Sequence, residues 1–495
     1  MFSAILLRSK IGDIRIANNL RLLKMTVSGS KQTSKTARSR VKRRDHKSAV
    51  GLQQHKRTGV DIAIALLTPL VGQEFLDKYQ LRDPLNRALR YGTKTVFSTA
   101  AASSREFKRI QNLRGGPTRL KSSGKDYFDL TPDDEQKMIV DTLDEFAEEV
   151  LRPAAHDADE AATYPRELIA KAAELGITAI NIPEDFDGIA AHRSSVTNVL
   201  VAEALAYGDM GLALPLLAPG GVASALTHWG SADQQATYLP EFAGENVPQA
   251  CVAIAEPQPL FDPTRLKTTA VRTPTGYRLD GVKSLVPAAA DAELFIIGAQ
   301  LDGKPALFIV ESSTKGLAVK ADPSMGIRAA ALGHVELSGV TVPLSARLGE
   351  PDANDAEYDV AYSEAIALAR LGWAALTVGT SHAVLDYVVP YVKEREAFGE
   401  PIAHRQAVAF MCANIAIELD GLRLITWRGA ARAEQGLPFI REAALAKRLG
   451  ADKGMQIGLD GVQLLGGHGY TKEHPVERWY RDLRAIGVAE GVVVI

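Results

Sequence analysis

The chain has 495 residues, of which 46% are hydrophobic and 23% are charged, a composition typical of globular proteins. Its two cysteines exclude a disulfide framework and a thiolate zinc site, and no apolar run is expected to reach the roughly 20 residues that cross a bilayer. The net charge of −2 conceals a division, because residues 1–125 hold 27 Lys and Arg against 7 Asp and Glu, and residues 126–495 hold 30 against 52.

The basic N-terminal extension, residues 1–125, contains three different stretches. Residues 1–24 are apolar and contain arginine, which is faintly similar to a transit peptide, although a start at Met25 is an alternative. Residues 28–57 are basic and lack aromatic residues, so they are predicted to be disordered. An anionic surface such as a membrane fits their charge, but a solvated tail is preferred and no specific nucleic acid is predicted. Residues 60–114 regain apolar side chains and are predicted to form helices that dock.

The acidic part begins with a predicted helical domain over residues 126–248. Thr131 is the expected N-cap of its first helix, with Pro132 at the first helical position and two acids after it. Apolar residues then recur at helical spacing from Met138 to Leu151. Further helical patterns cover residues 168–175, 196–207 and 220–229.

Short strand-like runs replace the helical pattern near Pro248. Together with turn signals such as Ser338-Gly339 they predict a small β-barrel or β-sandwich domain over residues 249–356. The runs are residues 250–255, 276–279, 294–299, 306–310, 333–337 and 340–342. Helical periodicity returns in a C-terminal bundle over residues 357–495. The predicted fold class is multi-domain α+β, because helices and strands are segregated instead of alternating.

Several motifs in the acidic part resemble those of a known family. Residues 391–402 read YVKEREAFGEPI and are followed by Gln406. Residues 463–471 read QLLGGHGYT, and residues 475–478 and 481–482 read PVER and RD. Upstream, residues 164–168 read YPREL and residues 182–188 read IPEDFDG. In this order the motifs resemble the acyl-CoA dehydrogenase family over residues 127–495.

The resemblance implies an enzyme that binds FAD and oxidises an acyl-CoA thioester to the trans-2-enoyl-CoA. In such a reaction a carboxylate takes the α-proton while the β-hydride goes to flavin N5, and the site must stabilise an enolate-like oxygen. Glu490 is the candidate base, and its backbone N–H is expected to help hold the thioester oxygen. The alternative position of the base in the family lies just before Arg370, where this chain has Ala369, which accepts no proton.

The resemblance also assigns residues to the cofactor and the substrate. Cofactor contacts are expected from Arg395, Phe398, Gln406, Gln463, Gly466 and Gly467, and substrate contacts from Arg370, Tyr470 and Gly491. A guanidinium suits a pyrophosphate, and glycine permits close backbone approach. The alternative role for Arg395 is a surface ion pair with Glu394 or Glu400. The alternative for residues 466–469 is an ordinary turn. No metal site is expected. In the family these groups reach the flavin of a neighbouring subunit, so a homodimer or homotetramer is predicted.

The sequence departs from the family pattern around the flavin. Ala255 replaces a Thr, Leu260-Phe261 replaces Gly-Ser, Leu285-Val286-Pro287 replaces Trp-Ile-Thr, and Val492 replaces a Thr. These losses leave three functions open: a dehydrogenase served by electron-transfer flavoprotein or another acceptor, an acyl-CoA oxidase that uses oxygen, and a flavin-poor acyl-CoA-binding or scaffold protein. A cytoplasmic location is expected, with the basic extension as the candidate membrane contact.

Overall fold

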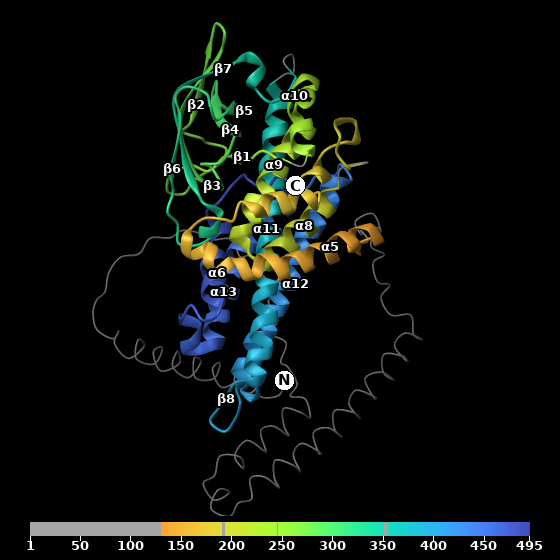
Figure 1. Ribbon diagram of the computed structural model, residues 1–495, viewed down its shortest axis with the longest axis vertical. Helices are drawn as coiled ribbons and strands as arrows, with labels where there is room; N and C mark the ends of the chain where they lie inside the picture. The colour runs from red at the N-terminus through yellow and green to blue at the C-terminus, as the bar shows by residue number, and fades with distance from the viewer. Residues whose placement is uncertain (1–129, 191–193, 245, 351–354) are drawn as a thin grey trace, which may run out of the picture. The chain divides into compact units, whose positions relative to one another are not determined.

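The computed structural model describes residues 130–190, 194–244, 246–350 and 355–495. The chain divides into two units, Met1–Ser122 and Ser123–Ile495, and all described residues lie in the second. The predictions for the basic extension, including the disorder of residues 28–57 and the helices over 60–114, lie outside the described residues. The second unit contains helices, then a sheet, then helices (Figure 1), so the predicted α+β class is confirmed.

The first helical part begins with α5 (Asp134–Phe146), whose N-cap is Asp133 and not Thr131. The Asp133 side chain accepts the Gln136 N–H at 2.8 Å, and the Gln136 side chain accepts the Asp133 N–H at 3.0 Å. This reciprocal capping box satisfies the N–H groups of Asp133 and Gln136, which explains the later start. The other elements are the π-helix η2 (Ala147–Leu151), α6 (Arg152–Ala161), α7 (Glu167–Glu174), η3 (Ala179–Asn181), η4 (Glu184–Phe186), α8 (Ser195–Gly208), α9 (Met210–Trp229) and α10 (Ala232–Ala243).

Helix α9 is buried in the core and begins ten residues earlier than predicted. The sequence predicted a helix only over residues 220–229. The helix observed extends back through Pro215 and Pro219, although proline is unfavourable inside helices. Among the described residues, α9 is also the one helix long and apolar enough to cross a membrane, which the sequence expectation had excluded. However, 94% of that stretch is buried inside the protein, so α9 is packed as a core helix.

The middle part is one seven-stranded sheet in the order β1-β4-β2-β3-β7-β6, with β5 paired to β4. The strands β2 and β6 were not predicted, and two predicted runs merge into β7, where Gly339 has a φ of +64°. The Ser338-Gly339 signal therefore marks an irregularity within one strand instead of a turn between two strands. The bounds are β1 (Ala250–Ala253), β2 (Thr269–Thr273), β3 (Gly276–Val286), β4 (Leu294–Leu301), β5 (Lys304–Glu311), β6 (Leu317–Ala321), η5 (Arg328–Ala330), β7 (Gly333–Pro343) and η6 (Leu344–Ala346).

The last part is a bundle of three long helices, α11 (Asp355–Glu394), α12 (Gln406–Glu434) and α13 (Ile440–Leu465). Figure 1 shows α11 running from the side of the sheet to the opposite end of the bundle, where the hairpin of β8 (Glu396–Ala397) and β9 (Glu400–Pro401) follows it. The C-terminal residues return to the middle of the body beside α9 (Figure 1). The shorter elements are η7 (Ile402–His404), η8 (Gly466–Tyr470), α14 (Val476–Asp482) and η9 (Ala485–Gly487).

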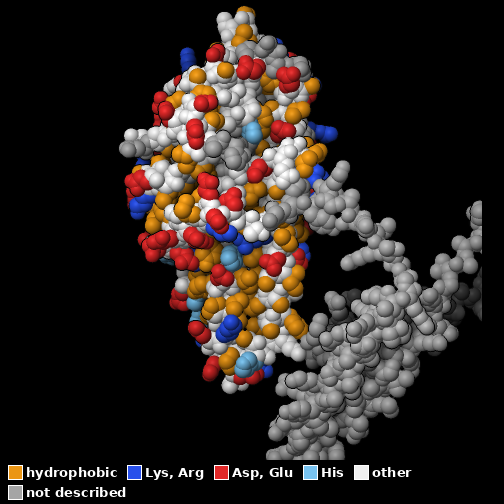
Figure 2. Space-filling model, turned by 90° about the vertical axis from the view of Figure 1, so that its right-hand side faces the viewer, with side chains coloured by type: hydrophobic (Ala, Val, Ile, Leu, Met, Phe, Trp, Pro, Cys, Tyr) orange, Lys and Arg blue, Asp and Glu red, His pale blue; other side chains and the backbone are white. Residues whose placement is uncertain are grey.

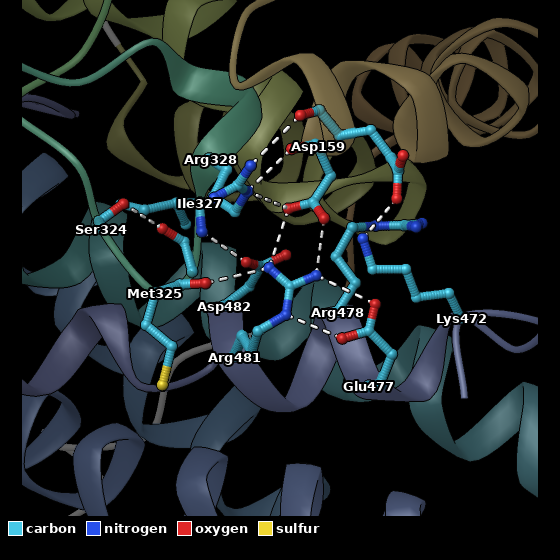
Figure 3. Close-up of polar contacts among 12 residues, drawn as sticks. Asp159, Ser324, Met325, Ile327, Arg328, Lys472, Glu477, Arg478, Arg481 and Asp482 are labelled. Carbon is cyan, nitrogen blue, oxygen red and sulfur yellow. Dashed lines mark hydrogen bonds and ion pairs between the residues drawn. The ribbon is translucent and has the colours of Figure 1, made fainter. Parts of the chain in front are cut away.

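A polar network joins the three parts (Figure 3). Arg481 of α14 forms two hydrogen bonds with Asp159 of α6, at 2.7 and 2.9 Å. The Asp482 carboxylate accepts the backbone N–H of Ile327 beside η5, and Arg478 contacts Asp209 at 2.9 Å. The Arg-Asp residues of the C-terminal motif therefore fix α14 against both the first helical part and the sheet part.

Candidate active site

Glu490 lies in the C-terminal segment after η9, and its carboxylate contacts two cations. The residue is 8% exposed. Arg370 of α11 places Nη2 2.8 Å from Oε1 and Nε 3.1 and 3.2 Å from the two carboxylate oxygens. Lys447 of α13 places Nζ 3.7 Å from Oε1 and donates a hydrogen bond to the Ala489 carbonyl. These contacts fix the orientation of the carboxylate, because an arginine fork and a carboxylate pair in one plane.

Lys447 is a site residue that the sequence reasoning missed. Burial is the main cause that lowers the pKa of Lys447 to about 8, with Arg370 acting in the same direction and Glu490 against it. The available signal was its position on α13, four residues after Ala443 and three before Gly450, which are both buried. A lysine on the buried face of a helix requires an internal partner, and here that partner is the Glu490 segment.

Backbone contacts hold the residues on either side of Glu490 between the sheet and the bundle. The Trp373 indole N–H donates to the Gly491 carbonyl at 3.0 Å, and the Val492 N–H donates to the Val252 carbonyl at 2.9 Å. Gly491 has a φ of +79°, and a Cβ there would lie 2.7 Å from Ile254. Glycine is therefore required after Glu490 both by the backbone conformation and by the close approach of β1.

The retained residues of the middle-domain motifs form a buried ion pair. Lys283 Nζ lies 2.8 Å from Glu256 Oε1, and the Glu256 carboxylate also accepts the N–H groups of Lys267 and Thr268. Burial acts to raise the pKa of Glu256, but Lys283 and these backbone donors outweigh it and lower that pKa. The pair fixes the segment containing Ala255 to β3.

The predicted cofactor residues lie together at the other end of the bundle. Arg395 follows the C-terminal end of α11, where its N–H bonds to the Tyr391 carbonyl. Tyr391 stacks edge-on against His474, and His474 stacks against His468 of the Gly466–Tyr470 turn. With a rise of 1.5 Å per residue, the 24 residues of α11 from Arg370 to its end span ~36 Å. The structure therefore groups Arg395 with the glycine turn and separates both from Glu490.

The exposed groups at this end fit the chemistry of a flavin dinucleotide. The Phe398 ring is 95% exposed, and a Cβ added to Gly466 or Gly467 would meet no described atom within 4 Å. None of the described residues forms an ion pair with the exposed Arg395 side chain, whereas Glu400 pairs with Arg405 at 3.0 Å. A guanidinium, an aromatic face and open glycine backbone suit pyrophosphate and ring groups.

A groove of about 430 Å³ lies between α12 and α13 beside two further predicted cofactor residues. Gln406 precedes its lining residue Ala407, and Gln463 lies three residues after Asp460, on the same helix face. Tyr470 is 88% exposed and belongs to this end of the bundle, so it does not join Glu490 within the same chain. One described His–Glu–His group, His468, Glu473 and His474, could hold a metal ion, although none was predicted.

Comparison with known proteins decides the family. Three domain families match in chain order: the N-terminal domain of acyl-CoA dehydrogenase over residues 133–246, its middle domain over 251–340 and its C-terminal domain over 359–493. The mitochondrial short-chain specific acyl-CoA dehydrogenase of Bos taurus is 30% identical over 363 residues, which are 72% of this chain and 86% of that protein. The chain belongs to the acyl-CoA dehydrogenase family.

Solved structures agree with this assignment. Butyryl-CoA dehydrogenase from Megasphaera elsdenii matches with a TM-score of 0.67 and 28% identity, covering 74% of this chain and 97% of that one. The FAD complex of PigA matches with a TM-score of 0.66 and 25% identity, covering 74% and 96%. Acyl-CoA dehydrogenases are FAD-dependent oxidoreductases that act on CH–CH groups, so the predicted family, fold and enzyme class are confirmed.

Proposed function

We propose that the chain oxidises an acyl-CoA thioester to the trans-2-enoyl-CoA with FAD as its cofactor. The observation that carries this proposal is the buried Glu490 carboxylate, which Arg370 holds in one orientation through three contacts of 2.8 to 3.2 Å. FAD, when bound, supplies the acceptor for the β-hydride. The family membership supports the reaction class, and the Glu490 geometry supports the identity of the base.

The residues around Glu490 have separate roles in this reaction. Glu490 takes the α-proton, and Arg370 keeps its carboxylate aimed, because a base acts efficiently only when it is positioned beside the proton. Lys447 anchors the Ala489 carbonyl and so fixes the adjoining backbone, whose Glu490 N–H holds the thioester oxygen. Gly491 allows the chain to turn away directly after the base.

We infer that each FAD is held between two subunits. Arg395 lies beyond the end of α11, ~36 Å along that helix from Arg370, so its cofactor contact serves the Glu490 of a partner subunit. Figure 2 shows hydrophobic side chains gathered over the helical end of the body. Exposed apolar residues recur every seventh position on α12, at Phe410, Ile417 and Leu424, as in a helix face that packs against another. These features favour a homodimer or homotetramer, with Tyr470 facing the shared site.

Mixing two inactive variants tests the shared site. Glu490→Gln removes the base and Arg395→Ala removes the pyrophosphate contact, so each homo-oligomer should be inactive. If a site combines Glu490 of one subunit with Arg395 of the other, a mixed dimer contains one intact site and one doubly defective site. Co-refolded mixtures should then recover up to about a quarter of wild-type activity by random pairing. No recovery in demonstrated mixed dimers would contradict the shared site.

Glu490→Gln also tests the identity of the base. The variant should bind FAD, seen as flavin absorbance, but acyl-CoAs should no longer bleach that absorbance under anaerobic conditions. Glu241→Gln changes an exposed glutamate on α10 in the same way and should leave bleaching intact. Undiminished bleaching by Glu490→Gln would overturn the assignment, and a colourless wild-type protein that takes up no FAD would favour the scaffold alternative.

The electron acceptor distinguishes the two enzymatic alternatives. We propose that electron-transfer flavoprotein or a similar acceptor reoxidises the enzyme, as expected for a cytoplasmic dehydrogenase. Hydrogen peroxide formed in proportion to product in air would instead identify an oxidase. The anionic surface suggested for residues 28–57 stays a prediction that vesicle binding by the full chain can check.

A further inference from the structure

Three side chains at the end of the bundle bring metal-ligating atoms together. His468 lies in the turn η8, and Glu473 and His474 lie in the loop between that turn and α14. One ring nitrogen of each histidine and one carboxylate oxygen of Glu473 all lie within 4.8 Å of one another. The cofactor and substrate contacts proposed above use none of these three side chains, so the group is available for another role.

Contacts from α11 hold the His474 ring in one orientation. The Tyr387 hydroxyl lies 2.7 Å from His474 Nδ1. The rings of Tyr387 and Tyr391 meet the imidazole edge-on, with centroids 6.0 and 5.7 Å from its own. When Nδ1 carries the proton and donates it to the Tyr387 hydroxyl, Nε2 keeps its lone pair for a metal ion. A hydrogen bond from the second ring nitrogen accompanies almost all histidine ligands of metals.

The backbone between the two histidines is anchored. The N–H and the hydroxyl of Thr471 both donate to the His468 carbonyl, at 3.1 and 2.9 Å. Lys472, the neighbouring cation, pairs with Glu160 of α6, so its charge is already balanced outside the group. The side chains of His468 and Glu473 are 48% and 74% exposed, and their atoms Nδ1 and Oε2 lie 3.9 Å apart. A fixed backbone therefore carries two ligand side chains that solvent leaves free to rotate.

Two imidazoles and one carboxylate suit zinc and chemically similar divalent ions, whereas calcium and magnesium prefer oxygen ligands throughout. Zinc binds nitrogen and oxygen ligands at about 2.0–2.2 Å, so the ligand atoms of a tetrahedral site lie roughly 3.3 Å apart. Separations of up to 4.8 Å exceed this value by about 1.5 Å. Rotation of the exposed His468 and Glu473 side chains covers that difference without any movement of the backbone.

We propose that His468, Glu473 and His474 bind one divalent transition-metal ion of the zinc class. The three side chains supply three ligands, and the fourth position stays open to water or another oxygen ligand. The bound ion links the turn η8 to the loop before α14, and Tyr387 positions one of its ligands from α11. The site includes none of the residues placed around Glu490, so its occupancy does not depend on the proposed dehydrogenase reaction.

Zinc titration of the untagged, FAD-loaded protein after dialysis against a chelator tests this proposal. Competition with a chromophoric chelator should reveal one zinc site per chain, and His474→Gln should weaken it at least about 100-fold. His404→Gln is the matched control and should keep the wild-type affinity. His404 is exposed and contacts Glu400 at 3.2 Å, but no third ligand joins them among the described residues. No zinc binding by the wild type, or equal affinity in His474→Gln, would overturn the proposal.

Two further measurements remain informative if His474→Gln does not fold. Tyr387→Phe removes the hydroxyl that orients His474 but keeps all three ligands, so zinc binding should weaken about 10- to 100-fold. Full affinity in this variant would contradict the positioning role of Tyr387. Hydrogen exchange of the wild type is then compared with and without zinc. The Thr471 amide, which bonds to the His468 carbonyl, should exchange more slowly when zinc is bound. Unchanged exchange at saturating zinc would contradict the link between the turn and the loop.

Discussion

Replacing Arg478 with Met should strongly destabilise the described body. Arg478 Nε contacts Asp209 Oδ2 at 2.9 Å, and the two side chains are 7% and 1% exposed. The substitution leaves the Asp209 carboxylate buried with the Leu212 N–H as a partner but without its cation. Removing one member of a buried ion pair costs about 3–5 kcal/mol. For a body of this size this corresponds to a fall in melting temperature of roughly 4–6 °C.

The assay is equilibrium urea unfolding together with thermal unfolding at one fixed FAD concentration, because ligand binding raises apparent stability. Arg448→Met is the matched control. Arg448 contacts Asp452 at 3.0 Å, but those side chains are 76% and 50% exposed. The control should lose less than about 1 kcal/mol, as exposed pairs do. If the Arg478 variant lost no more than the control, the reasoning about the buried pair would be refuted.

Three further predictions concern pH, catalysis and assembly. Burial and then Asp209 raise the pKa of Asp482 to about 8 from its ordinary 3.8, so the folded state binds the extra proton between these values. The contribution of this proton to stability should therefore be complete below pH 3.8 and should be lost as pH rises through about 8. The free energy of unfolding of Asp482→Asn, measured with urea across this range, should fall less with pH than that of the wild type. Arg370→Met should lower kcat about 100-fold in steady-state assays by freeing the Glu490 carboxylate, while FAD binding stays normal. Ile417→Glu should convert oligomers to monomers in size-exclusion chromatography with light scattering, whereas Met138→Glu, at an exposed position of α5, should not.

Hydrophobic periodicity was sufficient to predict the order of the three parts, because long helices and short strands repeat with different periods. It failed where tertiary burial overrides local preference. Pro215 and Pro219 oppose helix formation locally, but burial of almost the whole of α9 stabilises it. Strand β6 was missed because it is a five-residue, largely exposed edge strand, with no continuous apolar pattern.

The candidate site was predictable only where a motif carried it. Glu490 and Arg370 were named from their motif positions, and the structure brings their side chains together although 120 residues separate them. Lys447 belongs to no motif, and the hydrogen bond that gives it a role is made to a backbone carbonyl, whose position no sequence pattern records. The burial of residues 492–495 was equally hidden, since a run of valines predicts apolar surroundings but not which helices supply them.

The departures from the family pattern follow a physical rule that bears on the flavin. The retained middle-domain residues, Glu256 and Lys283, have their charged partners inside the protein, so losing either would leave a buried charge. The resemblance assigns the lost Trp and Thr side chains to contacts with the flavin. At two of those positions the backbone makes internal hydrogen bonds: the Ala255 carbonyl accepts the Ser284 N–H at 2.9 Å, and the Leu285 N–H donates to Asp322 at 2.9 Å. The fold therefore requires the charged partners of the first group, whereas buried apolar side chains such as Val286 and Val492 now fill positions of the second group.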